Sequence, residues 1–133
     1  MSRYLLDTNV ISDLIRNPQG KAAKRIAKVG EANICTSIIV AAELRYGGAK
    51  AGSKRLLNAV DDLLSEIEVL PLDSPADVDY GVIRLELEST GKRIGSNDLL
   101  IAAHAISIGA TIVTANTKEF NRVRGLKVEN WLA

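Results

Sequence analysis

The hydrophobic positions of this 133-residue chain form short continuous runs, separated by segments with helical periodicity. Runs such as Tyr4-Leu5-Leu6 and Ile112-Val113 do not alternate with polar residues, which is typical of strands covered on both faces of a parallel sheet. We therefore expect an α/β fold, in which helices cover a central parallel sheet. The predicted strands span residues 4–6, 33–36, 68–70, 111–114 and 127–129, the last of them at an edge.

Helical segments are predicted between these strands. Ser37 is a favourable N-cap, and the helix after it should reach about Tyr46, where Gly47-Gly48 loosens it. No repeat, low-complexity tract or linker divides the chain, so residues 1–133 are expected to form a single domain. The predicted helices span residues 9–16, 20–29, 37–46, 54–65, 74 or 77 to 89, and 97–108.

Composition narrows the function classes. The hydrophobic fraction of 47% suits a globular protein with a real core, and the net charge of +1 gives no general attraction for nucleic acid. One cysteine and one histidine exclude an internal disulfide, a thiolate zinc cluster and a site with two imidazoles. No stretch approaches the ~18 apolar residues of a membrane helix. We therefore expect a cytoplasmic protein without membrane contact.

Several polar residues fall at or near strand ends, where functional groups gather in parallel α/β folds. Asp7 follows the first strand, although helix capping alone would explain an aspartate there. Glu43 has no basic neighbour one helical turn away, so it either reaches a metal or turns to solvent or a distant arginine. Asp98 lies in the first turn of a very apolar helix, where the helix dipole also favours it. Asn116 follows the fourth strand and could be a plain turn residue.

Together these side chains indicate a divalent metal site. Convergent carboxylate oxygens are the ligands that Mg²⁺ or Mn²⁺ requires, and the lack of histidine and cysteine clusters argues against zinc. The sequence thus predicts that Asp7, Glu43 and Asp98 hold Mg²⁺ or Mn²⁺. His104, Cys35 and Trp131 are predicted to be packed side chains.

The motifs, taken in order, resemble the PIN domain in the form found in VapC toxins of bacterial toxin–antitoxin pairs. The resemblance spans essentially the whole chain. Its residues are Leu6-Asp7-Thr8-Asn9, Ser37, Glu43-Leu44, Tyr46-Gly47, Asp98 with the apolar run after it, Val113-Thr114-Ala115-Asn116, Glu119-Phe120 and Asn130-Trp131.

The resemblance implies a three-layer α/β/α fold and a Mg²⁺- or Mn²⁺-dependent endoribonuclease that leaves 5′-phosphate and 3′-hydroxyl ends. It also implies a VapB-like antitoxin, an RNA substrate with transfer RNA among the candidates, and a homodimer. By position, Asp7, Glu43 and Asp98 match the family's metal-binding acids, and Thr8 and Asn9 would orient Asp7. Glu43 would also orient or deprotonate the attacking water.

One position departs from the family pattern. Asn116 stands where the family often has a fourth acid, so its amide oxygen can accept a hydrogen bond from water but supplies no charge. We therefore include Asn116 among the catalytic residues and expect one firmly held ion, with Glu119 as a partial substitute for the missing acid.

The sequence leaves the RNA contacts open. A helical stripe that could bind phosphates is formed by Lys21, Lys24, Arg25 and Lys28, but most such stripes are simply the solvent-exposed face of an amphipathic helix. Arg45, Lys92 and Arg93 are alternatives nearer to the acidic residues.

Three other functions compete with the nuclease. A haloacid-dehalogenase-type phosphotransferase needs Asp-x-Asp, but Asn9 occupies the third position. A receiver domain needs an early acidic pair and a lysine directly after a late strand, and Thr114-Ala115-Asn116 lacks that lysine. A catalytically weak PIN-fold module that binds RNA or acts as a scaffold stays open, because Asn116 removes one charge.

Overall fold

A computed structural model describes residues 2–133 and shows five parallel strands in the order β3-β2-β1-β4-β5. The central strand β1 pairs with β2 and β4, with Leu5 opposite both Cys35 and Ile112. The strands are β1 (Tyr4–Leu6), β2 (Ile34–Ser37), β3 (Glu68–Leu70), β4 (Thr111–Val113) and β5 (Val128–Glu129). The predicted parallel sheet is confirmed.

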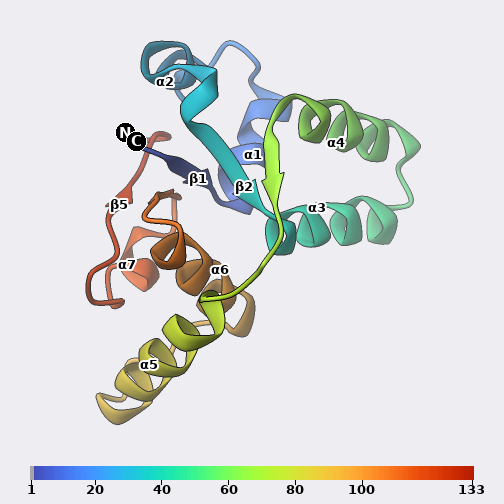
Figure 1. The fold of residues 1–133 in the computed structure, drawn as a ribbon. Coiled ribbons are helices and arrows are strands. Elements are labelled where there is room, and N and C mark those ends of the chain that lie inside the picture. The colour runs from blue at the N-terminus through green and yellow to red at the C-terminus, as the bar shows by residue number, and fades with distance from the viewer. Residues whose placement is uncertain (1) are drawn as a thin grey trace.

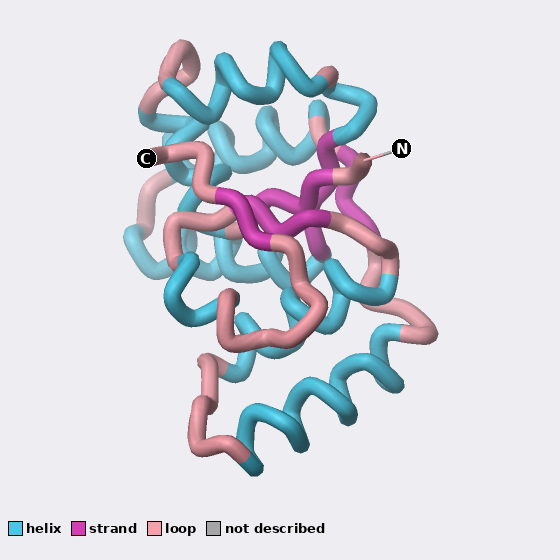
Figure 2. Tube along the Cα trace, turned by 90° about the vertical axis from the view of Figure 1, so that its left-hand side faces the viewer, coloured by secondary structure: helices cyan, strands magenta, loops and turns pink. Residues whose placement is uncertain are grey.

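Helices cover both faces of this sheet, as Figures 1 and 2 show, so the expected three-layer arrangement is confirmed. α1, α3 and α4 lie to one side of the strands, and α6 and α7 lie to the other (Figure 1). The helices are α1 (Thr8–Arg16), α2 (Lys21–Val29), the short 3₁₀ helix η1 (Glu31–Asn33), α3 (Ile38–Ala51), α4 (Lys54–Glu66), α5 (Ala76–Ser89), α6 (Ser96–Ser107) and α7 (Thr117–Phe120).

Parallel strands bring distant polar residues to one edge of the sheet. Leu5, Leu6, Ile112 and Val113 are fully buried in the sheet. The chain leaves β1 at Asp7 and β4 at Thr114, and both strands end at the same edge because they pair in parallel register. This edge carries the candidate site.

The prediction that Gly47-Gly48 loosens the third helix is wrong, because α3 continues to Ala51. Gly48 is buried where α3 crosses α4, and a Cβ at this position would lie 2.7 Å from Leu57 Cδ2. The missing side chain therefore lets the two helices approach closely. The helix ends at Gly52, whose φ of 64° is a left-handed conformation that glycine adopts readily.

The three side chains predicted to be packed are indeed buried. Cys35 lies in β2, and His104 is 1% exposed on α6, where its Nδ1 lies 2.7 Å from the Ser37 hydroxyl. Trp131 packs beside Tyr4, with 5.1 Å between the ring centroids. Within residues 2–133, no helix has the length and apolar character needed to cross a membrane.

Candidate functional site

Asp7 is buried at the end of β1, with 3% of its surface exposed. It is the N-cap of α1, and its Oδ1 accepts a hydrogen bond from the Thr8 backbone N–H at 2.8 Å. Its Oδ2 accepts from Thr114 Oγ1 at 2.8 Å and from Asn9 Nδ2 at 3.2 Å. Burial raises the pKa of Asp7, although these hydrogen bonds oppose the shift. Asp7 is therefore both a helix cap and a fixed buried carboxyl.

Thr114 links the first and fourth strands, and sequence reasoning did not assign it a role. Besides donating to Asp7, its hydroxyl oxygen accepts from the Asn116 backbone N–H at 3.0 Å and from Asn9 Nδ2 at 3.3 Å. Asn9 Oδ1 in turn accepts from the Ala115 N–H at 2.9 Å. A polar residue directly after a buried strand next to β1 was the available signal.

Glu43 lies half-buried on α3, and its carboxylate accepts hydrogen bonds from two neutral side chains. The Thr8 hydroxyl donates to Oε1, and Asn97 Nδ2 donates to Oε2 at 3.2 Å. Within residues 2–133, Glu43 forms no ion pair. The alternative of a distant arginine partner is therefore wrong, and the carboxylate keeps its charge uncompensated.

Asp98 and Glu119 form a carboxyl pair. Burial, a hydrogen bond with Glu119 and the charges of Glu119, Asp7 and Glu43 raise the pKa of Asp98 to about 7. Burial also acts to raise the pKa of Glu119, but hydrogen bonds from the Gly95 N–H and from Asp98 outweigh it and lower that pKa. Near pH 7 Asp98 is therefore only about half deprotonated, while Glu119 carries its charge.

Asn116 joins the site through Glu119. It precedes α7 and is half-buried, and its side-chain amide donates a hydrogen bond to the Glu119 carboxylate. Glu119 therefore supplies a carboxylate directly beside Asn116, whose own amide carries no charge. The short helix α7, which the sequence did not predict, carries this residue.

The fold thus brings Asp7, Glu43 and Asp98 together at one sheet edge, with Glu119 beside them. Their charges act on one another, because Asp7 and Glu43 both contribute to the raised pKa of Asp98. In the part of the chain from residue 2 onward, none of these carboxylates is in an ion pair. Like charges crowded in this way favour either a proton or a cation.

The donor set consists of carboxylate oxygens, which suits Mg²⁺ or Mn²⁺. Over the same residues, however, no three His, Cys, Asp or Glu side chains already stand close enough to hold a metal ion. Glu43 is turned toward Thr8 and Asn97, and Asp98 is turned toward Glu119. The ligands are therefore assembled in one region but not closed around one point.

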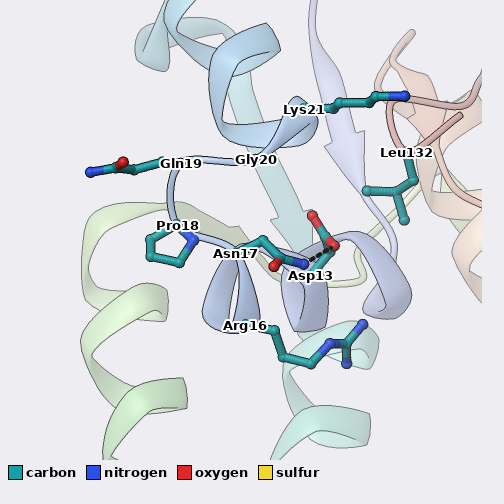
Figure 3. Close-up of a pocket in the computed structure, with 8 residues that line it drawn as sticks. All are labelled: Asp13, Arg16, Asn17, Pro18, Gln19, Gly20, Lys21 and Leu132. Carbon is teal, nitrogen blue, oxygen red and sulfur yellow. Dashed lines mark hydrogen bonds between the residues drawn. The ribbon is translucent and has the colours of Figure 1, made fainter.

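A cavity of about 520 Å³ lies elsewhere, at the C-terminal end of α1 (Figure 3). Among its lining residues, Asn17 Nδ2 donates a hydrogen bond to Asp13 Oδ1 at 2.8 Å. The cavity shares no residue with the acidic cluster, so the candidate chemistry does not depend on it. Its lining is Asp13, Arg16, Asn17, Pro18, Gln19, Gly20, Lys21 and Leu132.

Comparison with known proteins places this architecture in a family. The PIN domain family model matches residues 4–126. Ribonuclease VapC2 of Rickettsia felis is 41% identical over 96% of this chain and 97% of its own length. The tRNA(fMet)-specific endonuclease VapC of Shigella flexneri is 38% identical over 98% of this chain and 99% of its own length.

Solved structures agree with the sequence comparison. The crystal structure of VapBC2 from Rickettsia felis, bound to a DNA fragment from its promoter, contains a chain that is 40% identical to this one. The TM-score is 0.88, and the match covers 96% of this chain and 98% of that one. DNA-bound VapBC of Salmonella typhimurium gives a TM-score of 0.91 at 36% identity, over 98% of this chain and 99% of that one. The chain therefore belongs to the PIN-domain family and, within it, to the VapC ribonucleases.

Proposed function

We propose that this chain is a metal-dependent endoribonuclease toxin that hydrolyses RNA phosphodiester bonds with Mg²⁺ or Mn²⁺. The observation that carries this proposal is the gathering of Asp7, Glu43 and Asp98 at one sheet edge without a basic partner among residues 2–133. The names of the relatives, ribonuclease and endonuclease, support the same activity.

Asp7, Glu43 and Asp98 would hold the ion. Once bound, it would neutralise charge on the phosphate and acidify a water molecule. Asp7 is held by three hydrogen-bond donors, so its oxygens have a fixed direction. A rigid ligand of this kind loses little conformational freedom when a cation binds.

Glu43 is the candidate for orienting or deprotonating the attacking water. Thr8 holds one of its oxygens and Asn97 the other, and each oxygen keeps a further lone pair. These free lone pairs could accept a hydrogen bond from the attacking water, which is the geometry that a general base needs. In-line attack on phosphorus would then leave 5′-phosphate and 3′-hydroxyl ends.

Glu119 and Asn116 would set the number of ions. We expect one firmly held ion, because Glu119 is already engaged by the Gly95 N–H and the Asn116 amide. Asn116 would act in catalysis by fixing Glu119, whose second partner is Asp98. The Asn116 side chain would thus serve the reaction through a hydrogen bond and not through its own charge.

Partners are proposed by analogy. The two solved relatives are VapBC assemblies, which supports a VapB-like antitoxin for this chain. The Shigella flexneri relative is named for tRNA(fMet), so initiator transfer RNA is the first substrate to test. A homodimer and a cytoplasmic location stay predictions, and light scattering of the purified protein would test the first of them.

The deciding experiment combines metal binding with cleavage. Purified protein and the D7N and D98N variants would be titrated with Mn²⁺ by calorimetry and incubated with initiator tRNA and Mg²⁺. We expect the parent to bind Mn²⁺ and cut the RNA, and each variant to lose at least about tenfold in both. Mn²⁺ binding and cleavage unchanged in D7N and D98N would refute the assignment. RNA binding without cleavage by the parent would favour the scaffold alternative.

A further inference from the structure

We propose that Lys92, Arg93, Lys118 and Arg122, here called the basic rim, hold the RNA phosphates that flank the scissile bond. This inference rests on the proposed nuclease function and deepens it. The acidic cluster would repel a polyanion by itself, and the net charge of +1 provides no general attraction. The enzyme therefore needs local positive charge close to its carboxylates.

The two segments that carry the basic rim border the acidic cluster. The Gly95 N–H donates a hydrogen bond to Glu119. A Cβ on Gly95 would lie 3.5 Å from Glu119 Oε1 and 3.6 Å from Asp98 Oδ2. The segment before α6 therefore runs directly against the carboxyl pair. Arg93 precedes Gly95 by two residues on this segment.

Arg122 reaches the same place from the other side. It follows Glu119 by three residues, just beyond α7, and its Nη1 donates to the Arg93 backbone carbonyl at 2.8 Å. Its positive charge contributes to the lowered pKa of Glu119, after the hydrogen bonds described above. Arg122 thus ties the two segments together, and within residues 2–133 it forms no ion pair.

All four side chains of the basic rim are available to a ligand. Lys92, Arg93, Lys118 and Arg122 are exposed, and within residues 2–133 none forms an ion pair. The charge of Arg93 contributes to the lowered pKa of Glu88. The ion pair of Glu88, however, is formed with Arg84 at 2.9 Å. Exposed cations without carboxylate partners can exchange their counterions for phosphates.

The other basic residues suggested by the sequence are less suitable. Arg45 is paired with Asp61 of α4. Arg25 is paired with Glu129 at 3.4 Å and lies 5.6 Å from the centroid of the Trp131 ring. The rest of that stripe is on α2, which leads through η1 into the start of β2 and thus toward the opposite edge of the sheet (Figure 1).

The test compares two matched double substitutions, each removing two positive charges. R93Q/R122Q changes the basic rim, and K24Q/K28Q changes two exposed α2 lysines. Both are made in the D98N background and assayed with a chelator, so that RNA cleavage is suppressed. Binding of fluorescently labelled initiator tRNA is measured by anisotropy at several NaCl concentrations. Circular dichroism and Mn²⁺ titration of the same substitutions in the otherwise unaltered chain show that fold and acidic site are intact.

We expect R93Q/R122Q to weaken RNA binding at least about tenfold and to flatten the plot of log K against log salt by about 1.5. K24Q/K28Q should change affinity less than about twofold. R93K/R122K should recover most of the binding, because it restores charge.

Equal RNA affinity of R93Q/R122Q and its parent would overturn the proposed role of the basic rim. A loss of RNA affinity confined to K24Q/K28Q would do the same. These outcomes leave the nuclease proposal standing, because cleavage and Mn²⁺ binding test it separately. If the parent binds Mn²⁺ and cuts RNA, and the basic rim substitutions leave RNA affinity unchanged, only this inference is refuted. A parent without Mn²⁺ binding, RNA binding or cleavage defeats both.

Discussion

Thr8 donates a hydrogen bond from its hydroxyl to the Glu43 carboxylate, and its backbone N–H donates to Asp7 Oδ1 at 2.8 Å. One residue thus connects two candidate metal ligands, one directly after β1 and the other on α3. The contact fixes Glu43 relative to Asp7 before any ion arrives. A connection of this kind turns a cluster of acids into a site with defined geometry.

Replacing Thr8 with valine removes the hydroxyl and keeps the shape of the side chain. We expect Mn²⁺ affinity and cleavage to fall about tenfold, because Glu43 loses the donor that holds one oxygen. The free energy of unfolding should fall by only about 1 kcal/mol. Calorimetry, a cleavage assay and urea unfolding measure the three quantities. T8S should restore activity, and a T8V enzyme as active as the parent would remove Thr8 from the site.

The Asp98–Glu119 pair predicts a stability that depends on pH. The pKa of Asp98 rises from 3.8 to about 7 on folding, so the folded protein binds more protons than the unfolded chain between these values. Stability is therefore lost as pH rises from about 4 through 7. Without metal, the free energy of unfolding of D98N should exceed that of the parent by about 1–2 kcal/mol at pH 8, after allowance for the partial exposure of the carboxyl. The two values should be equal near pH 4.

Chemical unfolding across this pH range, in the presence of a chelator, measures the difference. Adding Mn²⁺ should reverse the order at pH 8, because a cation stabilises the parent carboxylates and not the amide. A D98N curve parallel to that of the parent at every pH would show that Asp98 does not carry the titration.

His104 predicts a second pH effect of opposite sign. Burial lowers the pKa of His104 below 6.5, because its ring lies 1% exposed beside Ser37. Below about pH 6.5 the unfolded chain binds a proton that the folded protein does not bind, so the free energy of unfolding decreases as the pH is lowered. The advantage of the parent over H104Q should shrink between pH 7 and pH 5, as measured by urea unfolding. A constant difference would indicate that packing alone accounts for His104.

The two neighbouring glycines of α3 should respond differently to alanine. A Cβ on Gly47 would meet nothing within 4 Å, so G47A should stabilise the helix by about 0.5–1 kcal/mol. A Cβ on Gly48 would press on Leu57 at 2.7 Å and 3.0 Å, so G48A should destabilise by about 1–3 kcal/mol. Thermal unfolding of the two variants gives the comparison, and equal effects would contradict the close α3–α4 contact.

Much of the site was predictable because a parallel sheet gathers strand ends. Asp7 lies directly after a buried run, and the register of β1 with β4 decides which residues share its edge. The sequence also shows that Glu43 has no basic residue one helical turn away on its own helix. What the sequence could not give were partners from other segments, such as Asn97 on α6 beside Glu43 on α3.

The remaining surprises depend on tertiary contacts. The low helix propensity of glycine predicts that Gly47-Gly48 loosens the third helix, but α3 continues through both residues and packs against Leu57. Helix α7 spans only Thr117–Phe120, too short for a periodic signal, although it carries Glu119. The basic rim combines residues from two segments that meet through the Arg122–Arg93 hydrogen bond, so no run of basic sequence marks it.

The hydrogen bond between Thr114 and Asp7 joins residues 107 positions apart. During translation, Asp7 leaves the ribosome before the strand that delivers Thr114. Long-range pairing of this kind forms late. A nascent chain therefore has no complete acidic site until β4 has been made and has paired with β1.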